Sequence, residues 1–248
     1  MFDGIAAGYD RLNRWMSLGQ DRRWRRALVR ALALSPGSRQ EDRGTGLQAF
    51  VPERHWLDVA TGTGEVALAL AAACPDCTVV GVDASPGMLQ IGHDKLAAAG
   101  LASRVELVPG DARALPFPDG SFDGACVAFG IRNIPDRPLA LQELVRVVRP
   151  GGIVAVLELT EPRHGPLATL ARLHVHVVVP RLGAWLSGDP AYAYLPKSVA
   201  AFPDPGTFAG LMRAAGLADV ETTPLTFGVC HLFIGTVPHE GMKEELMP

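Results

Sequence analysis

The chain has 248 residues, of which 48% are apolar, and its 23 basic and 26 acidic side chains give a formal net charge of −3. This length is enough to bury the core of a single α/β domain, and the small negative charge argues against a nucleic-acid partner. An acid stands among the first residues and no apolar stretch follows it, so we expect no secretory signal and a cytoplasmic protein.

Residues 1–34 are predicted to form helices that cover the domain. Aromatic and capping residues are frequent up to residue 20, and from Asp21 onward apolar side chains recur at helical spacing, with arginines mostly on the opposite face. A basic amphipathic helix of this kind presents either a solvated outer face or a contact surface for an anionic membrane. Residues 35–54 are polar and rich in glycine, which predicts a mobile linker.

Residues 55–64 predict a strand that ends in a tight turn. An apolar run leads to Asp58 and then to Gly62 and Gly64, and the helix-forming residues 65–71 follow. Glycines let the backbone turn sharply and lie against a ligand, close to the first amides of the helix. The spacing also fits the dinucleotide pattern G-x-G-x-x-G/A, so this unit predicts a nucleotide-like ligand without selecting one.

Strands and helices then alternate up to residue 158. The alternation predicts an α/β fold with a doubly wound, mostly parallel sheet. Helices are expected to start at Ser85 and Asp136, both good capping residues, and a last one at Asp204. A closing strand or hairpin is expected over residues 226–236. The remaining strands are predicted at residues 78–82, 105–108, 124–129 and 153–158.

The cysteines and histidines do not predict a metal site. Cys74 and Cys77 have zinc-ligand spacing, but no second pair and no matching histidines accompany them, so we expect structural thiols where a helix meets a strand. His174 and His176 lie in an apolar run without a neighbouring carboxylate, which is typical of packing residues.

Three acids stand at the ends of consecutive predicted strands: Asp58, Asp83 and Asp111. Ligands of such sheets bind at the carboxyl ends of the strands, so the three acids should line one crevice. A nicotinamide dinucleotide would use the first two and leave Asp111 unexplained. S-adenosylmethionine would use all three, for its amino-acid part, its ribose and its adenine. Each acid taken alone could equally be a helix cap or a turn residue.

Several segments resemble known methyltransferases. Residues 57–64, Gly-Asp-Ala at 110–112 and Arg-Pro-Gly-Gly at 149–152 resemble the motifs of class I S-adenosylmethionine methyltransferases. More narrowly, the chain resembles the menaquinone and ubiquinone biosynthesis C-methyltransferases, apart from residues 35–54 and the tail. That resemblance is carried by residues 2–13, by Leu-Pro-Phe at 115–117 with Phe-Asp at 122–123, by Phe-Gly-Ile-Arg-Asn at 129–133 and by residues 187–196, which end in Tyr-Leu-Pro.

The resemblance implies a seven-stranded Rossmann-like methyltransferase domain over residues 55–236, with a substrate-covering insertion at about 162–200 and a loose tail at 237–248. It implies S-adenosylmethionine as the cofactor, and because methyl transfer from a sulfonium to carbon needs no metal, we expect none. The residues that we assign to the cofactor site lie at strand ends and in the turns after them: Asp58, Thr61, Gly62, Thr63, Gly64, Asp83, Ala84, Met88, Asp111 and Ala112.

The implied reaction is methylation of a ring carbon of a polyprenylated quinol, most simply demethylmenaquinol. Arg132 and Asn133 are expected to bind or polarise the quinol oxygens, and Tyr9 and Tyr194 to close the pocket. Tyr9, an aspartate or a water held by Arg132 could take the proton. The alternatives are a ubiquinone-pathway benzoquinol as substrate, an NAD-dependent oxidoreductase, and a protein that binds S-adenosylmethionine without catalysis.

A quinol with a long isoprenoid tail has to be collected from a membrane. We therefore expect peripheral contact with the inner face of a membrane through the basic N-terminal helix and the apolar residues 167–186. A second copy of the chain, in a homodimer, is a further expected partner.

Overall fold

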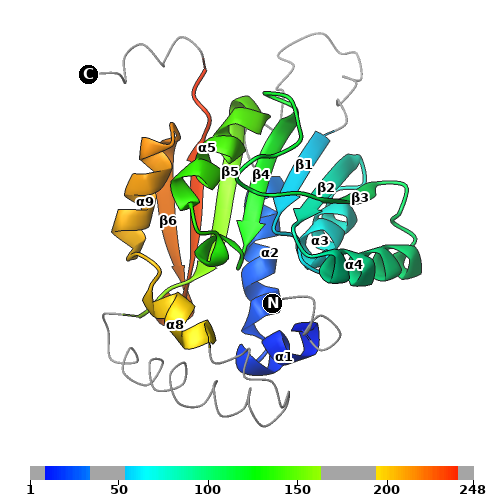
Figure 1. Ribbon diagram of the computed structural model, residues 1–248, viewed down its shortest axis with the longest axis horizontal. Coiled ribbons are helices and arrows are strands. Elements are labelled where there is room, and N and C mark those ends of the chain that lie inside the picture. The colour runs from blue at the N-terminus through cyan, green and yellow to red at the C-terminus, as the bar shows by residue number, and fades with distance from the viewer. Residues whose placement is uncertain (1–8, 34–53, 163–193, 240–248) are drawn as a thin grey trace, which may run out of the picture.

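The computed structural model describes residues 9–33, 54–162 and 194–239, and Figure 1 shows the arrangement of their helices and strands. The elements, with η marking 3₁₀ helices, are α1 (Tyr9–Met16), α2 (Gln20–Ala33), β1 (Arg54–Val59), α3 (Glu65–Ala73), β2 (Cys77–Asp83), α4 (Pro86–Ala99), β3 (Val105–Pro109), β4 (Phe122–Ala128), η3 (Ile131–Asn133), α5 (Arg137–Val147), β5 (Val148–Leu159), α8 (Tyr194–Ala200), α9 (Pro205–Ala214), β6 (Ala218–Leu225), η6 (Thr226–Gly228) and β7 (Cys230–Thr236).

The strands form one seven-stranded sheet in the order β3-β2-β1-β4-β5-β7-β6. The first five are parallel, whereas β7 runs antiparallel to both β5 and β6. Asp58 of β1 pairs in register with Gly81 of β2 and with Cys126 of β4. The predicted doubly wound, mostly parallel sheet is confirmed, and its parallel strands deliver their carboxyl ends to one edge.

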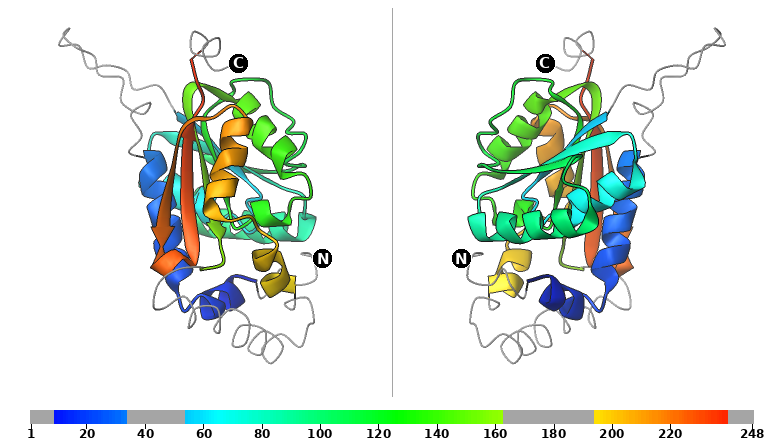
Figure 2. Two further views of the ribbon diagram at one scale, coloured as in Figure 1. Left: turned by 90° about the vertical axis from the view of Figure 1, so that its left-hand side faces the viewer. Right: turned by 90° about the vertical axis from the view of Figure 1, so that its right-hand side faces the viewer.

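Helices cover both faces of the sheet, as the two side views in Figure 2 show. On one face, α2, α3 and α4 bury a cluster that includes Trp24, Leu28 and Leu70. On the other, α5 and α9 bury a cluster that includes Leu141 and Phe208. The central strands are therefore apolar on both sides, which is why they read in the sequence as continuous apolar runs.

The predicted helix starts are confirmed by their caps. Ser85 Oγ accepts a hydrogen bond from the amide of Met88 at 3.3 Å, and Asp136 accepts one from Leu139 at 3.0 Å. Asp204 caps α9 in the same way. These side chains satisfy amides that have no partner inside their own helix.

The closing hairpin begins earlier than the sequence suggested. We expected strand structure only over residues 226–236, but β6 already starts at Ala218. Its polar residues and Pro224 hide the strand signal, because an edge strand has one free side and tolerates both. Val237, which we placed in the tail, is buried and exchanges backbone hydrogen bonds with residues 151 and 152.

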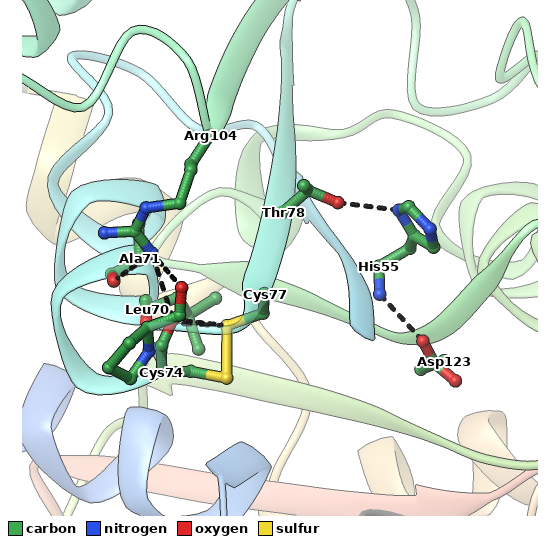
Figure 3. The surroundings of a disulfide bond; sticks show 9 residues. His55, Leu70, Ala71, Cys74, Cys77, Thr78, Arg104 and Asp123 are labelled. Atoms are coloured by element: carbon green, nitrogen blue, oxygen red, sulfur yellow. Dashed lines mark hydrogen bonds between the residues drawn. A yellow bond between two sulfur atoms is a disulfide. The ribbon is translucent and has the colours of Figure 1, made fainter. Parts of the chain in front are cut away.

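The structural thiols expected at positions 74 and 77 do lie where a helix meets a strand, but they are joined to each other. Cys74 and Cys77 form a disulfide, drawn in Figure 3, because the turn from α3 into β2 brings their Cα atoms to 5.6 Å. Beside it, Arg104 donates hydrogen bonds to the carbonyls of Ala71 and Cys74 and so satisfies the end of α3. The sulfur pair lies at the end of the sheet opposite the carboxyl ends of the parallel strands, since Cys77 is the first residue of β2.

Some predicted segments lie outside the described residues: the linker at 35–54 except Arg54, most of the insertion at 162–200, and the tail beyond residue 239. Among residues 9–33, 54–162 and 194–239, no helix is both long and apolar enough to cross a membrane.

Candidate cofactor and substrate site

A pocket of about 270 Å³ opens at the carboxyl ends of β1 to β4. Nine of the ten residues assigned to the cofactor from the sequence line it, together with Asn133: Asp58, Thr61, Gly62, Thr63, Asp83, Ala84, Met88, Asp111 and Ala112. Gly64 does not line the pocket. With φ of 77° it is the left-handed residue at the start of α3, where it packs beside Leu107 and Gly92.

The turn between β1 and α3 is tied to the neighbouring strand. The Thr61 amide donates to the carbonyl of Val82 at 3.0 Å, and the Gly62 amide donates to Oδ2 of Asp83 at 2.8 Å. Gly62 has φ of 57°, which a residue without Cβ adopts at little cost. The glycine turn and the acid at the end of β2 are therefore joined directly by a hydrogen bond.

Asp58 lies beneath the pocket and is 1% exposed. Its Oδ2 accepts hydrogen bonds from Thr61 Oγ1 at 2.6 Å and from the Ala67 amide at 3.1 Å. Burial raises the pKa of the Asp58 carboxyl to about 6, even though these hydrogen bonds and the nearby charge of Arg25 favour its ionised form. A carboxylate in this position gains from a cationic ligand above it.

The other two predicted acids are held at neighbouring strand ends. Asp83 accepts from the amides of Gly62 and Ser85, which fixes its carboxylate at the end of β2. Asp111, after β3, forms a salt bridge with Arg113 at 2.7 Å, and hydrogen bonds from Arg113 hold the pKa of Asp111 below its usual value. The three acids therefore follow one another across β1, β2 and β3, as predicted.

Two residues that line the pocket adopt left-handed backbone conformations although they are not glycine. Ala60 has φ of 54° at the end of β1, and Phe129 has φ of 59° at the end of β4. Between them, a Cβ on Gly130 would lie 2.5 Å from the Cβ of Ala60. Backbone strain of this kind persists only where its surroundings fix it, and it is frequent at functional sites. No sequence pattern predicted it at Ala60 or Phe129.

Arg132 and Asn133 are not equivalent in the structure. Asn133 lines the pocket, whereas Arg132 does not. The Arg132 side chain is 4% exposed and forms a salt bridge of 2.6 Å with the fully buried Glu158 of β5, and its Nη1 also donates to the carbonyl of Phe129. The expectation that both side chains point to the mouth of the crevice is therefore corrected for Arg132, which fastens the 129–133 loop to β5.

The N-terminal helix α1 contributes a residue that the sequence did not single out, Asp10. It lines the pocket and accepts hydrogen bonds from Thr63 Oγ1 at 2.8 Å and from Lys95 Nζ at 2.5 Å. Lys95, from α4, also contacts Glu65 Oε1 at 2.6 Å and Thr63 Oγ1 at 2.9 Å. This cluster fastens α1 to the turn before α3. The sequence feature that could have identified Asp10 is its position next to Tyr9, in the N-terminal segment that resembles the family.

Arg25 is the second residue that the sequence did not single out. It belongs to α2, lines the pocket, and its guanidinium carbon lies 5.3 Å from the ring centroid of Phe129. The helical pattern assigned the arginines of this helix to an outer face, and Arg22 and Arg23 are indeed exposed. Arg25 instead faces inward, and its side chain is 14% exposed.

Tyr9 and Tyr194 begin α1 and α8, which lie beyond the edge where the parallel strands end (Figure 1). Their side chains lie outside the described part of the structure, so their closing role stays a prediction. Among the described residues, no three histidine, cysteine or acidic side chains come together in a way that could hold a metal ion.

Residues 1–237 match the model of the ubiE/COQ5 methyltransferase family. Over 239 residues the chain is 45% identical to the demethylmenaquinone methyltransferase of Thermus thermophilus, covering 96% of this chain and 100% of the relative. It is 44% identical over 235 residues to the ubiquinone/menaquinone biosynthesis C-methyltransferase UbiE of Syntrophotalea carbinolica, covering 95% and 92%.

Solved structures show the same fold at low sequence identity. A putative S-adenosyl-L-methionine-dependent methyltransferase from Methanococcus maripaludis superposes with a TM-score of 0.67 at 14% identity, over 96% of this chain and 94% of the other. A SAM-dependent methyltransferase from Aquifex aeolicus superposes with a TM-score of 0.59 at 17% identity, over 86% and 89%.

The Lys95 cluster predicts how firmly α1 is attached. In Lys95→Met, Asp10 and Glu65 lose their cation, so α1 should detach more often from the turn before α3. Chymotrypsin should then cleave after the exposed Trp15 of α1 about fivefold faster, which corresponds to a loss of roughly 1 kcal/mol of local stability. The matched control is Arg149→Met, which removes a 2.6 Å pair with Asp123 at the start of β4. Equal cleavage rates in the two variants would contradict the prediction.

Proposed function

The chain belongs to the ubiE/COQ5 methyltransferase family, and we propose that it methylates a ring carbon of demethylmenaquinol with S-adenosylmethionine as methyl donor. The observation that carries this proposal is the series Asp58, Asp83 and Asp111 along one pocket, at the ends of three adjacent strands. A dinucleotide would leave the third acid unused. The choice of substrate is based on the relatives that are named demethylmenaquinone methyltransferase.

The described residues suit this cofactor. Five carboxylates and two arginines line the pocket, so its field attracts a ligand with net positive charge. Asp83 is positioned for a ribose and the segment at Asp111 and Ala112 for an adenine, while Asp58 lies at the remaining end. S-adenosylmethionine, when bound, supplies an electrophilic methyl carbon on its sulfonium.

On the substrate side, Asn133 is positioned to hydrogen-bond a quinol oxygen, because it lines the pocket next to the end of β4. Loss of the proton from that oxygen moves electron density onto the ring carbon that accepts the methyl group. Arg132 acts through the loop, since its salt bridge with Glu158 keeps residues 129–133 against β5. We propose Arg132 as a positioning residue and Asn133 as the direct contact, with Tyr9 and Tyr194 closing the pocket.

The first test is a methyl-transfer assay with two acceptors. Methyl-labelled S-adenosylmethionine is incubated with chemically reduced demethylmenaquinone and, in parallel, with a demethylated benzoquinol, and label is counted in the organic phase. We expect label on the naphthoquinol, and a kcat roughly 10- to 100-fold lower in Asn133→Ala because a polarising hydrogen bond is lost.

Calorimetric titration with S-adenosylmethionine is the control for this assay, since Asn133→Ala should retain cofactor binding. If label appears on the benzoquinol alone, the proposed substrate is wrong and the substrate is the ubiquinone-pathway benzoquinol instead. No label on either quinol, in protein that binds the cofactor, would refute the proposed reaction.

Asp58 predicts a pH dependence of cofactor binding. Below pH 6 the free protein holds a proton on Asp58, because the pKa of this buried group is about 6, and the neutral acid attracts a cation only weakly. The affinity for S-adenosylmethionine should therefore rise by up to about tenfold per pH unit between pH 5 and 6 and level off above it. Calorimetry across this range measures it. Asp58→Asn should give a flat profile, and an unchanged slope in that variant would exclude Asp58 as the cause.

We also propose that the protein collects its quinol from an anionic membrane surface. Trp15, Leu18 and Phe227 are 61%, 71% and 70% exposed, although they are large and apolar. Trp15 and Leu18 lie just before α2, and the Trp24 indole of α2 donates to Thr226 Oγ1, which places the η6 turn against the same helix. Exposed arginines accompany them: Arg14, Arg22, Arg23 and Arg26.

Sedimentation with phosphatidylglycerol vesicles tests this contact. Binding should weaken with salt, because basic side chains attract the lipid headgroups. Trp15→Ser or Phe227→Ser should lower it roughly tenfold, since each removes one inserted aromatic ring. Leu139→Ser changes another exposed apolar residue, on α5, and should have no effect. Absence of binding at every salt concentration would refute the membrane contact. The homodimer and the lack of a nucleic-acid partner stay predictions.

A further inference from the structure

Arg25 lines the pocket beside Phe129, which follows β4, whereas the predicted adenine position follows β3, on the other side of β1 and β2. Its Nη1 donates a hydrogen bond to Asp21 Oδ2 at 2.6 Å. Within the described residues, the Arg25 side chain makes this one hydrogen bond. A guanidinium carries five N–H donors in a planar fork, so this contact leaves donors for a ligand. The ring of Phe129, at 5.3 Å, supports the guanidinium from one side.

The order of the strands fixes which part of a bound cofactor lies near Arg25. Asp111 follows β3 and Asp83 ends β2, so the nucleoside occupies that half of the pocket. The other half lies over β1 and β4, where Asp58 and Phe129 line the wall. An amino-acid group placed there carries one ammonium and one carboxylate. Asp58 offers an anion for the first, and Arg25 offers a cation for the second.

We propose that Arg25 binds the α-carboxylate of the amino-acid part of S-adenosylmethionine, with Asp58 facing its ammonium group. This inference rests on the proposed function, because it requires that cofactor. Arginine suits the role, since its planar fork matches the two oxygens of a carboxylate. The helix that carries Arg25 is held in place by the 2.8 Å hydrogen bond between Trp24 Nε1 and Thr226 Oγ1 and by the buried side chains of Leu28 and Leu32.

This assignment gives α2 a function beyond covering the sheet. The glycine turn, Asp58 and Asp83 belong to the sheet and its loops, whereas the carboxylate contact comes from a helix that precedes the first strand. Asp21 is itself 6% exposed, and Ser17 Oγ donates to its other oxygen at 3.0 Å. The Asp21 carboxylate therefore positions the guanidinium at the pocket wall.

The test compares two ligands that differ by one group: S-adenosylmethionine and decarboxylated S-adenosylmethionine, which lacks the carboxylate. Dissociation constants are measured by calorimetry at pH 7.5. The wild-type protein should prefer S-adenosylmethionine. Arg25→Met should weaken binding of S-adenosylmethionine by about 10- to 100-fold and change the binding of the decarboxylated ligand less than about threefold. Arg25→Lys should fall between, because an ammonium keeps the charge and loses the fork.

Two control variants separate the ligand contact from the salt bridge. Asp21→Asn removes the ion pair but keeps a side-chain oxygen that can accept a hydrogen bond from the guanidinium, so the preference for the carboxylated ligand should become smaller than in the wild-type protein and remain larger than in Arg25→Met. Arg30→Met removes an exposed arginine from the last turn of the same helix and should leave the preference unchanged. Circular dichroism confirms that each variant is folded, and Arg25→Gln replaces Arg25→Met if the latter is not.

If Arg25→Met weakens the binding of both ligands equally, or weakens the binding of neither, the assignment of Arg25 is overturned while the proposed function stays intact. A wild-type protein that binds neither ligand would overturn the cofactor, and with it both proposals. Loss of discrimination in Asp21→Asn alone, with Arg25→Met unaffected, would likewise refute the contact.

Discussion

The carboxylate of Asp58 joins the parts of the site that have to stay together. One of its oxygens receives hydrogen bonds from the turn, through Thr61, and from the first turn of α3, through the amide of Ala67. The strand, the glycine turn and the helix are thereby locked to one another below the pocket. Burial of this acid has an electrostatic cost, visible in its raised pKa, which a cationic ligand would relieve. The same residue thus organises the turn and favours the charge of the proposed cofactor.

The pocket is completed from outside the sheet. Strands β1 to β4 bring the acids and the glycine turn to one edge, but Asp10 comes from α1 and Arg25 from α2. Asp10 and its partner Lys95 are 85 positions apart in the chain and are partly screened from solvent. The N-terminal helices therefore form part of the pocket wall, and a ligand that contacts Asp10 or Arg25 would also stabilise their attachment to the sheet.

The loop after β4 shows how a buried ion pair can serve a site without touching a ligand. Removal of either Arg132 or Glu158 would leave an uncompensated charge in the interior, which is strongly destabilising, so the pair holds its loop in one arrangement. That loop includes Phe129 with its left-handed backbone and ends at Asn133 in the pocket wall. The strained backbone and the polar side chain in the pocket wall are thus held by the same buried contact.

The sequence by itself determined the local units: the strand–turn–helix at residues 55–71, the helix caps, the parallel sheet and the series of acids. These depend on periodicity, on glycine and on capping side chains, which act over a few residues. Tertiary structure decided which arginine faces the pocket. Arg132 pairs with Glu158, 26 positions away, whereas Arg25 turns inward from an amphipathic helix whose arginines were expected mostly on the outer face. It also decided that β6 is an edge strand and that Cys74 bonds to Cys77. Local patterns do not specify such partners, because the sheet order and the docking of helices bring them together.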